Sequence, residues 1–189
     1  MNIIKHFVGG KVTDGTSQRK GQVFNPATGD QESEVILATK SDLDKTVEIA
    51  KKDFETWTLK PELQRARIMF KFKKKKKKNF DELTKLIFLE HGKVYEDAKG
   101  SLIRGLDVVE FACGIPHVLK GEFSENVGTN VDSYSMRQPL GVAAGITPFN
   151  FPAMVPMWMF PLAIACGNTF ILKPSEKDPS CPIRLAELL

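Results

Sequence analysis

The chain has 189 residues, of which 42% are hydrophobic and 26% are charged, and these proportions are typical of a globular domain. Its formal net charge is +4, but residues 73–78 are six consecutive lysines, and the rest of the chain holds 21 basic residues against 23 acidic ones. The basic charge is therefore local, and it argues against nucleic acid as a partner.

The longest apolar run, residues 151–166, is too short and too rich in proline to predict a membrane span, since a spanning helix needs about 20 apolar residues. The three cysteines are widely spaced, and none of their pairs has the spacing of a metal or redox motif. We therefore expect no metal site and no membrane partner. The cysteines and the lack of a targeting segment predict a cytoplasmic protein, with the mitochondrial matrix as the alternative.

The first forty residues are expected to form short strands joined by tight turns. Strand-like residues at 6–8, 11–12 and 22–24 each run into Gly-, Asn- or Asp-containing turns, and residues 34–38 form a further candidate strand.

A helix is then predicted from Ser41, which can cap it with the help of Asp44, to about Trp57. Pro61 suits the first turn of a second helix. The apolar positions of that second helix are Leu63, Ala66, Ile68 and Phe70.

The lysine run Lys73–Lys78 interrupts this apolar pattern. We interpret it as a solvated helix face or a corrupted stretch of sequence in preference to a nucleic-acid or localisation patch, because it contains no aromatic residue for stacking. Helical spacing resumes at Phe80 and ends at Gly92, and residues 96–119 are predicted to form one further helix.

The last third of the chain predicts a strand–helix–strand unit. Residues 133–137 alternate like a half-exposed strand. Residues 141–146 are short and wholly apolar, like a strand covered on both faces. A helix over 153–165 and a strand over 169–172 complete a βαβ unit with a parallel sheet, and another helix begins at Pro182.

Polar residues follow both strands of this unit. Thr147 to Asn150 come after the first strand, and Lys173 to Glu176 come after the second. Because ligands bind at the carboxyl ends of parallel strands, these segments suit a nucleotide. Lys173 can donate to a ribose hydroxyl or a phosphate, and Glu176 can accept from a ribose hydroxyl. From the residues alone, two simpler interpretations stay open. Lys173 would be a solvated lysine at a strand end and Glu176 an acid at a helix N-terminus, and Asn150 would be a turn asparagine that satisfies its own backbone.

The motif PFNFP at 148–152, with MWMFPL at 157–162 and CGNT at 166–169, resembles the aldehyde dehydrogenase superfamily. In detail it is most similar to the CoA-acylating methylmalonate-semialdehyde dehydrogenase branch. The resemblance continues back through EHGK at 90–93 to HFVGG at 6–10. It implies an α/β fold of N-terminal strands and helices followed by the first βαβ unit of a Rossmann-like NAD-binding domain.

The resemblance also implies roles for the site residues. Asn150 would be the oxyanion-hole amide that polarises the aldehyde. Thr147 and Phe149 would contact NAD, Lys173 and Glu176 would hold the adenosine ribose, and Lys177 would lie nearby. The reaction implied oxidises a small semialdehyde through a cysteine thioester, with CoA as co-substrate, and the whole enzyme would be a homo-oligomer.

The chain departs from that pattern in its length, since family members are more than twice as long. None of Cys113, Cys166 and Cys181 matches the nucleophile; the first two resemble core cysteines, and Cys181 is expected in a loop. We therefore expect an N-terminal fragment that is inactive alone. The expected division is 1–132, an oligomerisation-type strand at 133–140, and the truncated βαβ unit at 141–189. The alternatives are a fragment of a non-acylating aldehyde dehydrogenase and a non-catalytic binding fragment.

Overall fold

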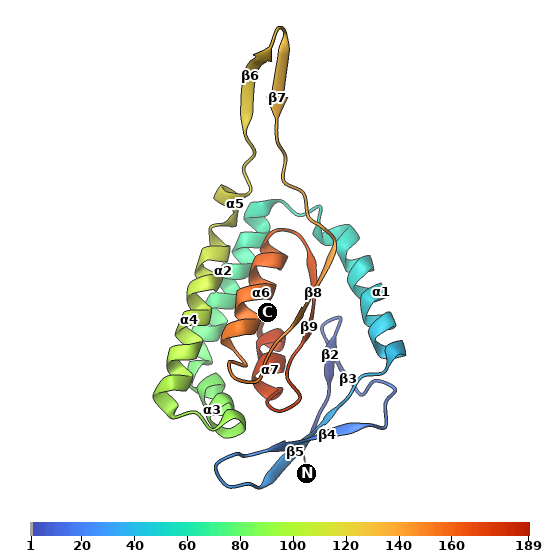
Figure 1. The fold of residues 1–189 in the computed structure, drawn as a ribbon, viewed down its shortest axis with the longest axis vertical. Coiled ribbons are helices and arrows are strands. Elements are labelled where there is room, and N and C mark those ends of the chain that lie inside the picture. The colour runs from blue at the N-terminus through green and yellow to red at the C-terminus, as the bar shows by residue number, and fades with distance from the viewer. Residues whose placement is uncertain (1) are drawn as a thin grey trace.

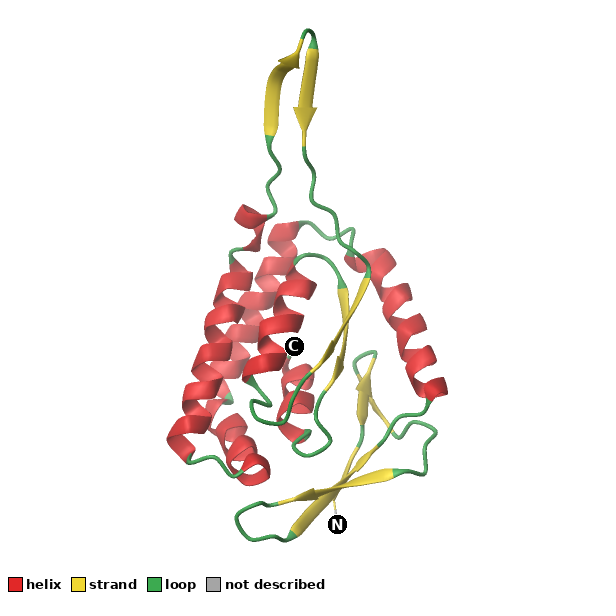
Figure 2. Ribbon diagram, in the orientation of Figure 1, coloured by secondary structure: helices red, strands yellow, loops and turns green. Residues whose placement is uncertain are grey.

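The computed structural model describes residues 2–189 and has a mixed α/β architecture, with helices and short sheets arranged as in Figure 1 and Figure 2. A three-stranded sheet opens the chain, in the order β1-β5-β4, with β1 parallel and β4 antiparallel to β5. Strands β2 and β3 form a separate antiparallel hairpin. The predicted N-terminal strands are confirmed, and β1 was not predicted. The five strands are Asn2–Ile4, His6–Val8, Lys11–Thr13, Lys20–Phe24 and Gln31–Ile36.

Helix α1, Lys40–Trp57, begins with a capping box that differs from the predicted one. The Thr39 hydroxyl accepts from the Asp42 backbone N–H at 3.1 Å, and the Asp42 carboxylate accepts from the Thr39 backbone N–H at 2.9 Å. The prediction that Ser41 caps the helix is wrong, because Thr39 is the residue that keeps an extended backbone while its side chain satisfies the first turn.

The helical layer contains one break that the apolar pattern did not reveal. The predicted single helix over 96–119 ends at Gly114, after which a short helix, α5, follows. Gly92 ends α3 in the left-handed conformation, with φ of 77°, as expected for a helix-terminating glycine. The four helices of this layer are α2 Glu62–Lys78, α3 Phe80–His91, α4 Tyr95–Cys113 and α5 Ile115–Val118.

Helix α2 buries a face that includes one residue of the lysine run. Two of its predicted apolar positions are exposed, Leu63 by 56% and Phe70 by 58%, whereas Met69, Phe72 and Lys76 are buried. The interpretation of the run as a solvated helix face is therefore wrong for Lys76. Residues three and four positions apart share one face of a helix, and the register set by Met69 and Phe72 turns Lys76 inward.

An exposed hairpin projects from the body of the molecule and is drawn at the top of Figure 1. Its strands are β6, Phe123–Gly128, and β7, Val131–Tyr134, and all their residues are exposed. Strand β7 overlaps the strand predicted at 133–137 but begins two residues earlier. Strand β6 was not predicted, because its polar sequence lacks a regular apolar alternation.

The predicted βαβ unit is confirmed. Strands β8, Val142–Ile146, and β9, Thr169–Lys173, pair in parallel. Helix α6, Met154–Ala165, lies between them in the sequence. Strand β8 is less covered than expected, since Ile146 is 78% exposed. On α4, a Cβ on Gly105 would lie 2.2 Å from the Met157 methyl of α6, so these helices pack closely.

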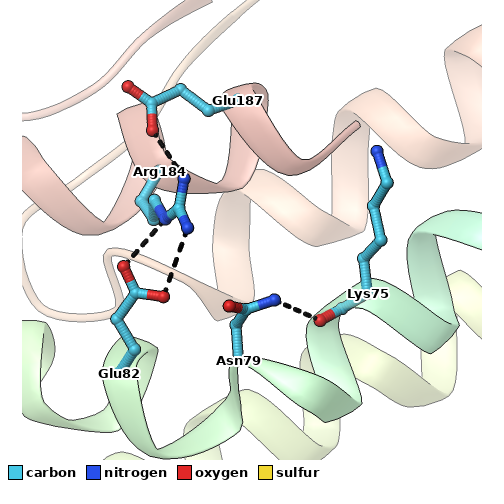
Figure 3. A network of polar contacts seen from close by, with 5 residues as sticks. All are labelled: Lys75, Asn79, Glu82, Arg184 and Glu187. Carbon is cyan, nitrogen blue, oxygen red and sulfur yellow. Dashed lines mark hydrogen bonds and ion pairs between the residues drawn. The ribbon is translucent and has the colours of Figure 1, made fainter.

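Helix α7, Ser180–Leu188, follows the unit and is tied to α3 by charged groups. Arg184 pairs with Glu82 through Nε–Oε1 and Nη2–Oε2 distances of 2.8 and 3.3 Å, and it also pairs with Glu187 (Figure 3). The same view shows the Asn79 amide donating to the Lys75 carbonyl between α2 and α3. Across residues 2–189, no helix is both long and apolar enough to cross a membrane.

Candidate functional site

The two polar loops predicted to share a ligand lie next to each other at one edge of the parallel sheet. Strand β8 ends at Ile146 opposite Lys173 of β9, and the Thr147 backbone N–H donates to the Lys173 carbonyl at 3.1 Å. The parallel register therefore places the 147–150 loop directly beside the 173–177 loop, as the sequence predicted.

The loop after β8 combines one buried hydroxyl with two exposed side chains. Thr147 is 4% exposed, and its Oγ1 has no hydrogen-bond partner among the described residues. Phe149 is 49% exposed, and Asn150 is exposed as well. The backbone carbonyl of Asn150 accepts a hydrogen bond from Lys93 Nζ at 2.5 Å. The loop thus presents an amide and an aromatic ring at the surface.

The end of β9 and the loop after it carry the three charged residues assigned to a nucleotide. Lys173 Nζ lies 3.0 Å from Glu176 Oε2. A hydrogen bond from the Glu176 backbone N–H to its own carboxylate, together with Lys173, lowers the pKa of that carboxyl. Lys177 Nζ lies 4.5 Å from the centre of the Phe149 ring. This cation–π contact joins the two loops directly.

Two residues beside the loops were not assigned a role from the sequence. The His91 ring stacks on Phe149 with centroids 6.3 Å apart, and Lys93 Nζ lies 4.3 Å from the Phe151 ring centre. Burial and the nearby Lys93 charge lower the pKa of His91. The EHGK stretch at 90–93 was part of the family resemblance, but no spacing in the sequence places it beside Asn150.

Two carboxyl groups were also missed. Asp178 is 2% exposed, and burial followed by the charge of Glu90 raises the pKa of its carboxyl to about 8. Among the described residues, no hydrogen bond of good geometry reaches either oxygen, although Ser175 lies near enough to lower the pKa of this carboxyl. Glu90 accepts hydrogen bonds from the backbone N–H, at 3.0 Å, and the hydroxyl of Ser180, while burial raises its pKa.

None of the three cysteines lies in either loop. Cys113 and Cys181 are buried, Cys166 is partly buried, and burial raises the pKa of each thiol. The prediction that Cys181 lies in a loop is wrong, because it is in the first turn of α7 and is 1% exposed. A thiol held in its neutral form is a poor nucleophile.

The residues of the two loops fit a nucleotide cofactor. Lys173 and Lys177 supply positive charge, and Glu176 can accept from ribose hydroxyls, whereas the Thr147 hydroxyl is buried. The start of α6, beside the first loop, adds free backbone N–H groups. Two surface hollows, of about 360 and 320 Å³, lie elsewhere, between α2 and α4 and beside β1.

Comparison with known proteins finds relatives that are similar to this chain over its whole length. A malonate-semialdehyde dehydrogenase of Pseudomonas aeruginosa is 50% identical over 188 residues, which are 100% of this chain and 38% of that protein. Malonate-semialdehyde dehydrogenase 3 of Geobacillus kaustophilus is 51% identical over 185 residues, with 98% of this chain and 38% of that protein covered. This chain therefore spans 38% of the length of these relatives.

Solved structures agree with the sequences. A methylmalonate-semialdehyde dehydrogenase from Oceanimonas doudoroffii matches with a TM-score of 0.97 at 50% identity, covering all of this chain and 38% of that one. A Sinorhizobium meliloti protein solved in complex with NAD matches equally well, at 54% identity and the same coverage. The family model for the aldehyde dehydrogenase family matches residues 12–189. The chain thus belongs to the aldehyde dehydrogenase family, and its mixed α/β fold corresponds to part of an aldehyde dehydrogenase structure.

Proposed function

We propose that these 189 residues supply the oxyanion-hole amide and the adenosine-ribose part of the NAD site of a methylmalonate- or malonate-semialdehyde dehydrogenase. The observation that carries this proposal is the adjacency of the two loops, which the Thr147–Lys173 hydrogen bond and the Phe149–Lys177 contact join. The relatives at about 50% identity support the choice of substrate class.

In this proposal NAD, when bound, accepts a hydride from the substrate. The Asn150 amide donates to the aldehyde oxygen as that oxygen gains negative charge. Lys173 and Glu176 exchange their mutual ion pair for the two ribose hydroxyls, Lys173 as donor and Glu176 as acceptor. Thr147 and Phe149 line the nucleotide beside Lys177.

For the whole enzyme, we propose the following reaction and division of the chain. The aldehyde would add to a cysteine thiol and be oxidised to a thioester with NAD as the hydride acceptor, its carboxylate would leave as carbon dioxide, and the acyl group would pass to CoA and free the cysteine. Methylmalonate semialdehyde would thus yield propionyl-CoA, and malonate semialdehyde acetyl-CoA. Residues 1–132 and 141–189 belong to the NAD-binding part, and 133–140 to a strand used between subunits of a homo-oligomer. Bacterial relatives and three free thiols support a cytoplasmic setting.

The test is a calorimetric titration of the 189-residue chain with NAD. Glu176→Gln and Lys173→Met are expected to weaken binding about tenfold or more, because a hydrogen bond to a charged group contributes about 1.5–3 kcal/mol. Lys40→Met is the matched control, since Lys40 forms a similar surface pair with Asp44 at 2.7 Å on α1. Unchanged affinity in both loop variants, or no binding by the native chain, contradicts the proposal.

We also propose that the 189-residue chain alone has no dehydrogenase activity, because its three cysteines are withdrawn from the loops and held as neutral thiols. With semialdehyde, NAD and CoA present, we expect no NADH absorbance at 340 nm above the rate without protein. NADH production that depends on one of these cysteines would refute this part of the proposal.

A further inference from the structure

We propose that Lys93 is the positioning residue of the Asn150 loop: its ammonium group holds the Asn150 backbone carbonyl and the Phe151 ring, and so sets where the Asn150 amide points. This inference rests on the proposed function for its catalytic meaning. The positioning itself rests only on contacts within this chain.

The Asn150 side chain has no support of its own. It is exposed, and among residues 2–189 no hydrogen bond to its amide is formed. The loop is irregular until Met154, where α6 begins, and the first stabilising hydrogen bond of that end runs from the Val155 N–H to the Phe151 carbonyl at 3.3 Å. An amide that must meet a developing oxyanion within a few tenths of an ångström needs a fixed backbone beneath it.

The Lys93 ammonium group contacts three different partners. Its Nζ lies 2.5 Å from the Asn150 carbonyl oxygen, 3.2 Å from His91 Nε2 and 4.3 Å from the centre of the Phe151 ring. An ammonium has three N–H donors, and these contacts engage its whole charged end. A hydrogen bond from a charged donor is stronger than a neutral one, and the cation–π contact adds to it.

The backbone on both sides of Lys93 is held in place as well. It follows Gly92, which ends α3 in the left-handed conformation, and it precedes Val94, the N-cap of α4. A Cβ on Gly92 would lie 2.7 Å from Pro26, so the turn is also packed against the N-terminal segment. Lys93 therefore links the positions of two helices to the loop that carries Asn150.

The charges around Lys93 keep it suited to this task. Burial lowers the pKa of Lys93, and Arg104 acts in the same direction, whereas Asp97 and, once it is ionised, the buried Asp178 favour the charged form. Arg104 lies 6.0 Å from the same Phe151 ring, so the ring is in contact with cations from both α4 and the turn before it. His91 completes the set of titratable groups that face the ammonium.

The experiment uses NMR spectroscopy of the 189-residue chain and three variants. Lys93→Met keeps the aliphatic stem and removes the donors, Lys93→Arg restores a cation, and Lys99→Met is the matched control. Lys99 also pairs with an acid, Glu96, and lies 4.9 Å from an aromatic ring centre, but it does not touch the loop. The readouts are the Asn150 side-chain NH₂ signals and hydrogen exchange at the Val155 amide.

In Lys93→Met we expect the Asn150 signals to move towards unstructured positions and Val155 exchange to quicken about tenfold, as loss of a charged hydrogen bond implies. Lys93→Arg should restore both readouts, and Lys99→Met should change neither. Native values of both readouts in Lys93→Met, or equal changes in Lys99→Met, overturn the inference. If Lys93→Met does not fold, the native protein decides: Lys93 ammonium protons that exchange as fast as those of the exposed Lys40 also overturn it.

The NAD titration separates this inference from the proposed function. If the native chain fails to bind NAD while Lys93→Met shifts the Asn150 signals, the positioning role stands and the proposed function fails. If NAD binds and the Asn150 signals stay native in Lys93→Met, the proposed function stands and the positioning role fails.

Discussion

The side-chain nitrogen of Lys76 on α2 lies against the sulfur of Met157 on α6, inside the hydrophobic core. Lys76 is 1% exposed, and its Nζ lies 5.7 Å from the Phe72 ring centre. No carboxylate pairs with it among the described residues. Burial lowers the pKa of Lys76 to about 7, so this core amine is only partly protonated at neutral pH.

Replacing this amine should stabilise the protein. A lysine whose pKa falls from 10.5 to about 7 on folding costs on the order of 3–5 kcal/mol at pH 7, and Lys76→Met removes that cost with little change in volume. Urea unfolding should show a midpoint shifted upwards with the slope unchanged. Lys75→Met, at an exposed neighbouring position, is the control and should shift the midpoint little.

The free energy of unfolding should pass through a minimum near pH 7–8. Lys76 has a depressed folded pKa, so its penalty is full below pH 7 and is relieved as pH rises towards 10.5. Asp178 has a raised folded pKa of about 8, so its penalty grows as pH rises from 3.8 and is full above 8. Glu90, whose pKa is also raised, adds to the falling limb.

Urea titrations between pH 5 and 9 test this minimum, below the range where the buried Cys181 thiol begins to oppose folding. Lys76→Met should abolish the rise above pH 8, and Asp178→Asn should flatten the fall below pH 7. A native profile that rises steadily from pH 5 to 9 would show that Asp178 is ionised in the folded protein.

The N-terminus of α1 should depend on Thr39 and not on Ser41. Thr39→Val removes the hydroxyl that accepts from the Asp42 backbone N–H and so caps α1. The free energy of unfolding should fall by about 1 kcal/mol, or the melting temperature by about 2–4 °C. Ser41→Ala should change the melting temperature by less than half as much. An equal loss in both variants would contradict the assignment of the cap to Thr39 rather than Ser41. Asp42, whose pKa is lowered to about 2 by Thr39, should lose its stabilising effect as pH falls below 4.

The ion pair between Arg184 and Glu82 should contribute only modestly. Their side chains are 32% and 46% exposed, and a double-mutant cycle with Arg184→Gln and Glu82→Gln should give a coupling of about 0.2–1 kcal/mol that declines in 1 M salt. The pair Lys51–Glu48, at 60% and 70% exposure, is the reference and should give less. A coupling above about 2 kcal/mol would show that α7 is held mainly by this pair.

Much of the fold could be predicted because its signals are local. The wholly apolar strand at 142–146, the helix after it and the strand at 169–173 each differ sharply in composition from their neighbours. Gly92 and Gly114 show the limit of such signals. Both end helices, but only the first interrupts the apolar periodicity strongly enough to be recognised.

The candidate site also contains residues that the sequence predicted and residues that it could not predict. Thr147, Asn150, Lys173 and Glu176 follow strand ends, so chain order alone predicted that they share one edge of the sheet. Lys93 and Asp178 could not be found by such reasoning. Lys93 is 57 positions from Asn150, and Asp178 acts through burial rather than through a motif.

The sequence by itself therefore determined the βαβ unit, the two polar loops and the family resemblance, because each depends on residue order within a few dozen positions. Only the tertiary structure decided that Lys76 is buried, that Thr39 caps α1 and that Lys93 holds the Asn150 backbone. These outcomes depend on the rotation of each helix and on contacts between distant segments. Residue order cannot specify them, because neighbouring positions on a helix point in directions that packing alone selects.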